Sequence, residues 1–297
     1  MIKKFTIYIP FLLVFLILGI VSFFPSQENN DQGILVNDIS RMNPTYVKEI
    51  ILADSIEKIQ NVIKRANKEN LKVSMAGTKH SQGGHAFYDG ALLLDMTGLN
   101  KILSLDTSNK IIHVQSGVTW AQIQDFINPH NLAIRAMQSS NIFTVGGSMS
   151  SNVHGRDPQN SLIVETIEDF RLILSTGEIV NVSRDENQEL FSLVIGGYGL
   201  FGIITDVRIR LKGNNILEKE ALLLDYKDFP EFFRKNIIGD PKVELFIARP
   251  SISSGSFLRE TIVNLWKTAE SQTQFGDEIY NLLGEENVIR DKFFFSL

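Results

Sequence analysis

Three glycine-rich segments, at residues 76–85, 144–155 and 193–204, punctuate the body of this chain. Glycine accepts positive φ and lets a ligand or another backbone approach closely. Each segment alone is a weak signal, because it could also be a surface loop, a tightly packed helix start or a bend between strands. Short apolar runs with strand periodicity separate the segments, and helical patterns are few. The pattern favours an α+β fold whose loops can approach a ligand.

The body opens with a strand–helix–strand pattern. Residues 47–52 predict a strand, Asp54 is the expected helix N-cap with Glu57 as its capping-box partner, and residues 71–75 predict the next strand. No G-x-G-x-x-G motif follows the first strand, which disfavours a doubly wound dinucleotide-binding fold. Further strands are expected at 92–95, 111–115, 170–174, 179–182, 201–211 and 243–248, and helices at 119–127 and 225–236.

The first glycine-rich segment, AGTKHSQGGH, can direct backbone N–H groups inward at an anion, as phosphate-binding loops do. The second, TVGGSMSSNVHG, combines Gly146 and Gly147 with small side chains that leave room for a bulky planar group, and His154 could bond an oxygen of a cofactor or substrate. The third, LVIGGYGLFGII, could let backbone groups meet a ring system at its edge. Together, the segments predict a site for a large ligand with an anionic and a planar part.

The order and spacing of these segments resemble the PCMH-type FAD-binding domain of the vanillyl-alcohol-oxidase family. LDMTGLNKIL and IIHVQSGVTWAQI lie between the first two segments and are also typical of that family, and the resemblance runs over residues 47–211. It implies an α+β fold with a two-subdomain FAD-binding domain. Asn214 onward resembles the beginning of an α+β substrate-binding domain more weakly.

The resemblance implies that the first segment holds the FAD pyrophosphate and the second lies along the flavin. His80 directly precedes Ser81, as in alditol-type relatives whose histidine is bound covalently to the flavin; the alternative is a noncovalent hydrogen bond. His154 is the candidate catalytic polar group, and no metal site is expected. The implied cofactor-binding residues are Ala76, Gly77, Thr78, Lys79, His80, Ser81, Gln82, Gly83, Thr144, Val145, Gly146, Gly147, Ser150, Ser151, His154, Gly202 and Ile203.

Within the family, the chain resembles sugar and polyol oxidases, including aldonolactone, alditol and decaprenylphosphoryl-ribose oxidases. The implied reaction is oxidation of a CH–OH group of a sugar, polyol or aldonolactone, with hydride transfer to flavin N5. Oxygen or a quinone-linked carrier is the expected electron acceptor. Two alternatives stay open: a flavin-binding protein without turnover, and a membrane-tethered binding module that is not an enzyme.

The expected organisation is a membrane anchor and tether at 1–33, an FAD-binding domain at 34–213 and a partial substrate-binding domain at 214–297. Lys3 and Lys4 precede an uncharged run at 5–24, which as a helix would span roughly 30 Å, about one hydrocarbon core. This predicts an uncleaved transmembrane helix with the body outside the cytoplasm. Family chains continue beyond the length of this one, so a truncated chain with weak or no turnover is expected.

Composition narrows the functions further. The formal net charge of −5 argues against a nucleic-acid partner, because no basic stripe is available to release counterions from phosphates. The chain has no cysteine, which excludes disulfides, thiolate metal sites and cysteine nucleophiles. The remaining histidines are interpreted as structural or exposed; they are His85, His113 and His130.

Overall fold

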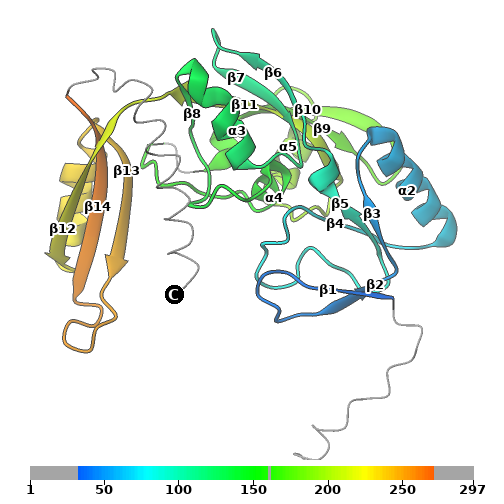
Figure 1. The fold of residues 1–297 in the computed structure, drawn as a ribbon, viewed down its shortest axis with the longest axis horizontal. Helices are drawn as coiled ribbons and strands as arrows, with labels where there is room; N and C mark the ends of the chain where they lie inside the picture. The colour runs from blue at the N-terminus through cyan, green and yellow to red at the C-terminus, as the bar shows by residue number, and fades with distance from the viewer. Residues whose placement is uncertain (1–32, 160–161, 271–297) are drawn as a thin grey trace, which may run out of the picture. The chain divides into compact units, whose positions relative to one another are not determined.

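The computed structural model describes residues 33–159 and 162–270 (Figure 1). They form an α+β fold in two compact units. Within the described residues, unit 1 comprises 33–99 with 173–178, and unit 2 comprises 100–159, 162–172 and 179–270. No helix in this described part is long and apolar enough to cross a membrane, and the predicted span at 5–24 lies outside it.

Unit 1 is built on a three-stranded parallel sheet with the order β3-β5-β4. The strands are β3 (Glu49–Leu52), β5 (Leu92–Asp95) and β4 (Val73–Ala76), and Leu92, Leu93 and Leu94 of the central strand are fully buried. Such a continuous apolar run is typical of a parallel strand covered on both faces. A small antiparallel pair, β1 (Ile34–Val36) with β2 (Thr45–Val47), precedes this sheet, so the predicted strand at 47–52 is divided at Lys48.

Helix α2 (Ile56–Glu69) connects β3 to β4 and buries Ile59, Val62, Ile63 and Ala66 at the predicted helical spacing. Its N-cap is Ser55, whose hydroxyl accepts a hydrogen bond from the Lys58 amide at 3.3 Å. The prediction of Asp54 as the cap is therefore wrong by one residue. Asp54 instead forms an exposed ion pair with the Lys58 ammonium at 3.0 Å. A serine cap satisfies the same unpaired N–H groups of the first turn.

The main sheet of unit 2 is antiparallel and has the order β10-β9-β11-β7-β6, with β8 paired to the end of β11. One face buries alternate side chains such as Ile112, Val114, Val207 and Ile209, whereas the other face is polar. This alternation is what an antiparallel sheet with one core face requires. The strands are β6 (Ile102–Asp106), β7 (Ile111–Gln115), β8 (Leu132–Ile134), β9 (Ile167–Ile173), β10 (Ile179–Ser183) and β11 (Ile203–Gly213), the last beginning two residues later than predicted.

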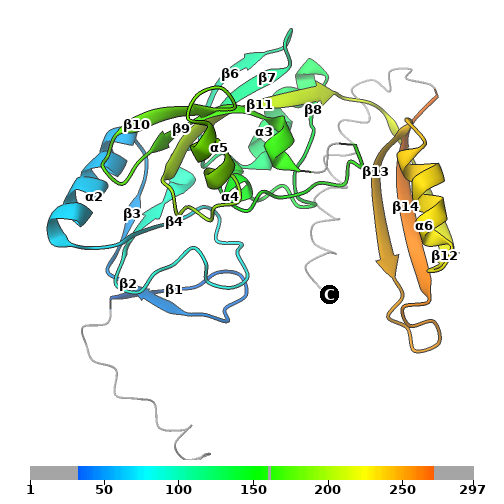
Figure 2. The same ribbon diagram turned by 180° about the vertical axis from the view of Figure 1, so that it is seen from behind.

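Three short helices lie beside this sheet in both views (Figures 1 and 2). Helix α3 (Trp120–Ile127) has the predicted start: the Thr119 hydroxyl and the Gln122 side chain form a reciprocal capping box. Helix α4 (Val145–Ser150) carries the two glycines of the second glycine-rich segment, Gly146 and Gly147. Helix α5 (Gln188–Val194) leads into the third segment and buries Phe191 and Val194.

A second, smaller sheet in unit 2 has the order β12-β14-β13. Its strands are β12 (Leu217–Asp225), β14 (Glu260–Thr268) and β13 (Val243–Pro250); β12 and β14 were not expected from the sequence. The predicted helix at 225–236 is observed as α6 (Phe229–Phe232), followed by a π-helical turn η5 (Phe233–Ile238). Phenylalanines of both helical pieces pack with Val263 and Leu265, so one face of the sheet is covered.

Candidate functional site

In unit 1, the first glycine-rich segment leaves the end of β4 as an irregular loop. Lys79 and Gly84 have φ values of 59° and 73°, so the loop turns sharply at both positions. A side chain on Gly83 would collide with His85, because a Cβ there would lie 2.2 Å from the imidazole Cε1. A side chain at Gly83 would therefore have to displace the His85 ring, which covers this glycine.

Asp38, a residue that sequence analysis missed, holds this loop. The carboxylate is 5% exposed and accepts hydrogen bonds from the Gly84 amide at 2.7 Å, the Ser40 amide at 2.9 Å and the Ser40 hydroxyl at 2.6 Å. The Ser81 hydroxyl approaches it at 3.3 Å. The hydrogen bond from the Ser40 hydroxyl, together with those from Gly84, the Ser40 amide and Ser81, outweighs the effect of burial and lowers the pKa of Asp38 to about 2.

Two more contacts attach the loop to the same N-terminal stretch. The Asn43 side-chain amide donates to the Gly83 carbonyl at 2.8 Å, and the Ile39 amide donates to the Lys79 carbonyl at 3.0 Å. The loop thus uses its carbonyls and one amide to bind residues 38–43. Within the described residues, the amides of Thr78, Ser81, Gln82 and Gly83 have no acceptor, as an anion-binding loop requires.

His80 is half-buried in this loop. Its Nδ1 lies 2.7 Å from the Thr78 carbonyl oxygen. Because a carbonyl only accepts, Nδ1 carries the proton in this contact. The predicted cofactor residues in unit 1 are therefore consecutive residues of one braced loop; they are Ala76, Gly77, Thr78, Lys79, His80, Ser81, Gln82 and Gly83.

In unit 2, the second segment forms α4, which begins at Thr144. The Thr144 hydroxyl accepts from the Gly147 amide at 3.4 Å, and the Gly146 amide donates to the Ser116 carbonyl at 2.7 Å. A Cβ on Gly146 would lie 2.9 Å from the Ser116 Cβ, so glycine is required for this close packing. The first half of the segment is thus fixed against the end of β7.

The small side chains of this segment divide into buried and exposed positions. Ser148 is fully buried and hydrogen-bonds the Trp120 indole N–H at 3.0 Å, so it serves packing and leaves no room for a ligand. Ser150 donates to the Gly146 carbonyl at 2.9 Å. Gly147, Ser151 and His154 are the exposed residues of this segment, so they present surface that a planar group can reach. His154 Nδ1 lies 3.1 Å from the Gly155 carbonyl oxygen.

The third segment lies beside the second. The Gly196 amide donates to the Met149 carbonyl at 2.9 Å, and the Tyr198 amide donates to the Ser150 carbonyl at 3.0 Å. Gly202 has φ of 148° and leads into the buried Ile203. The two segments predicted to contact one ligand are therefore joined by backbone hydrogen bonds within one unit, and Ile203 can contribute its backbone but not its side chain.

Replacing Gly197 with alanine is expected to separate these two segments. A Cβ at this position would lie 2.1 Å from the Leu193 carbonyl oxygen, so the backbone must shift. Overpacking of this kind costs typically about 1–3 kcal/mol. We expect Gly197→Ala to have a lower melting temperature and to lose bound flavin faster than the control Gly177→Ala. A Cβ at Gly177 would meet open space, so the free-energy cost of that change comes only from its φ of 86°. Equal flavin retention by both variants would contradict the role assigned to this segment.

Four buried polar atoms have no hydrogen-bond partner within the described residues: Asn37 Oδ1 and Ser74 Oγ in unit 1, and Ser116 Oγ and Arg135 Nε in unit 2. Two of them, those of Asn37 and Ser116, lie next to the loops described above. Each precedes or contacts a segment described above, since Asn37 adjoins Asp38 and Ser116 packs on Gly146. A buried polar atom without a partner is costly, so both are positions where a polar cofactor would supply a missing bond. The described residues contain no group of histidines and carboxylates that could hold a metal ion.

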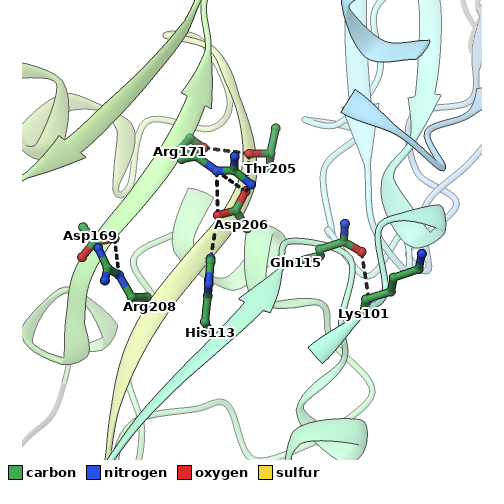
Figure 3. Close-up of polar contacts among 8 residues, drawn as sticks. All are labelled: Lys101, His113, Gln115, Asp169, Arg171, Thr205, Asp206 and Arg208. Carbon is green, nitrogen blue, oxygen red and sulfur yellow. Dashed lines mark hydrogen bonds and ion pairs between the residues drawn. The ribbon is translucent and has the colours of Figure 1, made fainter. Parts of the chain in front are cut away.

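A separate polar cluster lies on the exposed face of the main sheet (Figure 3). Asp206 is 2% exposed; its carboxylate accepts from His113 Nε2 at 2.7 Å, from Arg171 at 2.7 Å and from the Thr205 hydroxyl at 2.7 Å. Burial raises the pKa of Asp206, but the hydrogen bonds from Arg171, His113 and Thr205 outweigh it, and the net pKa is lowered. An outer Asp169–Arg208 pair at 2.8 Å lies alongside. The cluster supports the structural interpretation of His113.

Comparison with known proteins relates the sequence to flavoproteins. Residues 47–183 match the family model described as FAD binding domain. The chain is 26% identical to L-gulonolactone oxidase of Bos taurus, over 52% of this chain and 35% of that protein. It is 27% identical to decaprenylphosphoryl-beta-D-ribose oxidase of Mycolicibacterium smegmatis, over 58% of this chain and 38% of that protein. It is 27% identical to cytokinin dehydrogenase 3 of Arabidopsis thaliana, over 66% of this chain and 39% of that protein. The matched regions thus span little more than a third of these relatives.

Proposed function

Residues 47–183 match the family model described as FAD binding domain, and from that premise we propose that the protein binds FAD and oxidises a CH–OH group of a sugar, polyol or aldonolactone. The observation that supports cofactor binding most directly is the braced loop after β4, with its amides of Ser81, Gln82 and Gly83 that have no acceptor in the described part of the chain. The names of two relatives, a lactone oxidase and a ribose oxidase, support the donor class. Cytokinin dehydrogenase 3 is a relative whose name points to a different donor.

The two units are assigned different parts of FAD. In unit 1, the amides of the loop at 76–83 would donate to the pyrophosphate. The Asp38 carboxylate would hold the loop in this conformation through its hydrogen bonds from the Gly84 amide and the Ser81 hydroxyl. In unit 2, the exposed Gly147, Ser151 and His154 would lie along the flavin. Bound FAD supplies the hydride acceptor, N5; the residues of this chain bind and orient it. His154 is assigned the polar contact beside the flavin.

His80 is proposed to bind the flavin covalently. The Nδ1 proton is directed at the Thr78 carbonyl, which assigns the bond to the flavin 8α-methyl to Nε2. The noncovalent alternative is a hydrogen bond from the same ring. His80 directly precedes Ser81, Gln82 and Gly83, whose amides are assigned to the pyrophosphate, so its ring belongs to the same loop.

The purified full chain is expected to be yellow because it contains FAD. Acid releases this FAD if it is bound noncovalently, whereas covalently bound FAD stays with the protein. The pyrophosphate assignment predicts FAD over FMN, because FMN has no pyrophosphate. Acid precipitation, phosphodiesterase treatment and chromatography identify the flavin, and in-gel fluorescence detects a covalent link. Fluorescence in the wild type and none in His80→Ala supports the link; fluorescence in both moves it to another residue. A colourless protein would instead favour the flavin-free binding module.

The same preparation tests turnover. With an artificial electron acceptor and a panel of polyols, aldoses and lactones, donor-dependent reduction of the acceptor supports the proposed reaction. Bleaching of the flavin by the same donor, when acceptor and oxygen are both left out, shows that the electrons pass through the flavin. A stable flavin that no donor reduces supports the second candidate, a flavin-binding protein without turnover. This second candidate is kept because the matched regions cover only about a third of the two relatives whose names support the oxidation.

We also propose that the chain is held at a membrane by residues 5–24, with its body outside the cytoplasm. Support comes from the uncharged run behind Lys3 and Lys4. Oxygen or a membrane quinone-linked carrier would then accept the electrons. Carbonate extraction followed by N-terminal sequencing is the test, and a soluble mature protein that starts near Gln27 would refute the anchor.

A further inference from the structure

The turn between β13 and β14 exposes large apolar side chains where polar residues are usual. Within residues 251–259, Ile252 is 86% exposed, Phe257 56% and Leu258 54%. Leu258 also has a φ of 57°, a conformation that favours glycine or asparagine. Single exposed apolar residues are ordinary, but three on one turn form a cluster of the kind that marks a protein or membrane contact. We call residues 251–259 the apolar turn.

The polar groups of the apolar turn bond to one another. The Ser251 amide donates to the Glu260 carbonyl at 2.7 Å, and the Leu258 amide donates to the Ser251 carbonyl at 2.8 Å. The hydroxyls of Ser251 and Ser256 lie 2.8 Å apart. Arg259 donates to the Gly255 carbonyl at 2.7 Å. Internal bonding of this kind lowers the cost of moving a backbone out of water, because fewer groups lose a partner.

The apolar surface continues onto the neighbouring face of the small sheet. Leu223 and Ile262 are cross-strand partners, 63% and 50% exposed, on the face opposite the one that α6 covers. Tyr226, 49% exposed, bonds through its amide to the Arg259 carbonyl at the base of the turn. Figures 1 and 2 show the turn projecting beyond β12 and α6. The surface is thus a projecting end and not a groove.

The charges around this end suit a phospholipid surface. Residues 245–259 contain Arg249 and Arg259 and no carboxylate. The first acids, Asp225 and Glu260, face each other across the strands at the base of the turn. Arginines next to an apolar tip, with a tyrosine at the boundary, match the lipid interface, where cations meet phosphates and aromatic rings lie at the headgroup level.

We propose that the apolar turn inserts into the interfacial region of a phospholipid bilayer. Ile252, Phe257 and Leu258 enter the acyl boundary, and Arg249 and Arg259 contact lipid phosphates. The uncharged run at 5–24 is a separate feature of the sequence that points to the same partner. Insertion would hold the β12–β14 sheet at the lipid surface. This inference needs no flavin and is independent of the proposed oxidation.

The chain has no cysteine, so one introduced thiol can be labelled specifically. Full-length Ser254→Cys carries a polarity-sensitive dye on the apolar turn, and Ser108→Cys carries it on the exposed, polar turn after β6. Both are reconstituted into vesicles of phosphatidylcholine and phosphatidylglycerol. Doxyl-labelled lipid is expected to quench most of the Ser254→Cys emission, with a blue shift, and to leave the Ser108→Cys emission unchanged.

A second variant shows whether the apolar side chains are responsible. Ile252→Ser, Phe257→Ser and Leu258→Ser are combined in the Ser254→Cys chain; these exposed changes should leave the melting temperature unaltered. The inference expects lipid quenching to disappear in this variant. It is overturned if quenching persists there, or if the original label is not quenched. It is also overturned if iodide protection of the label rises with protein concentration in the absence of lipid, since a second copy would then cover the turn.

Discussion

Asp38→Ala is expected to lose most of its affinity for FAD while the rest of the chain stays folded. The Asp38 carboxylate accepts from Gly84, Ser81 and both donors of Ser40, so alanine leaves part-buried donors without an acceptor. An unsatisfied donor costs about 1–3 kcal/mol, which corresponds to roughly a 5- to 150-fold weaker cofactor affinity if the loop reorders only on binding. Titration of the apoprotein with FAD, followed by flavin fluorescence, measures the change.

Asp54→Ala is the matched control, because its carboxylate is exposed and forms an ion pair with Lys58 of α2. An equal loss of affinity in both variants would show that the brace around Asp38 is not what prepares the loop. Asp38→Asn should be intermediate, since an amide oxygen accepts some of the same bonds without the charge.

The lowered pKa of Asp38 also sets a pH window. The folded-state pKa of about 2 lies below the ordinary value of 3.8, so the ionised carboxylate stabilises the fold. That contribution is fully present above about pH 4 and is lost as the pH falls through the folded-state value. FAD release between roughly pH 4 and pH 2 should therefore be less steep in Asp38→Ala than in the wild type.

The sequence predicted the parts of the fold that depend on local pattern. Helix α2 shows the expected apolar spacing, and α3 begins at Thr119 with its capping box, because neighbouring residues decide both features. The cap of α2 was misassigned by one residue because Asp54 and Ser55 are both good capping residues, and only the backbone geometry distinguishes them. Strands β12 and β14 were missed, since each carries charged residues on part of its length.

Of the candidate site, only the glycine-rich segments could be predicted from the sequence. Three glycine-rich segments are visible in the sequence, and their arrangement predicted an FAD-binding domain, in agreement with the family model that residues 47–183 match. Asp38 was not found, because Asp38 and Gly84 lie far apart along the chain and only folding brings them together. The Asp38-x-Ser40 spacing is a visible signal of a local turn, but not of a brace on a distant loop. Ser148 shows the converse, since a small residue in a promising segment proved to pack against Trp120.

Asp206→Ala is expected to be the most destabilising single change on the polar face of the main sheet (Figure 3). The carboxylate is 2% exposed and bonds to His113, Arg171 and Thr205. Removing one member of a buried charged network typically costs about 3–5 kcal/mol. The side chains of Arg171 and His113 are 41% and 29% exposed, so they can regain water and the cost should fall to about 2–3 kcal/mol. That corresponds to a melting temperature lower by roughly 4–12 °C.

Asp169→Ala provides the comparison on the same face. Its partner Arg208 is 56% exposed, and an exposed ion pair contributes only about 0–1 kcal/mol. Because the pKa of Asp206 is lowered in the folded state, its contribution is present above the ordinary carboxyl value and is lost as the pH falls through the folded-state pKa. Thermal melts of both variants at pH 7 and pH 3 should therefore show a gap between Asp206→Ala and the wild type that narrows on acidification. A gap of the same size for both variants would show that burial of Asp206 does not strengthen its network.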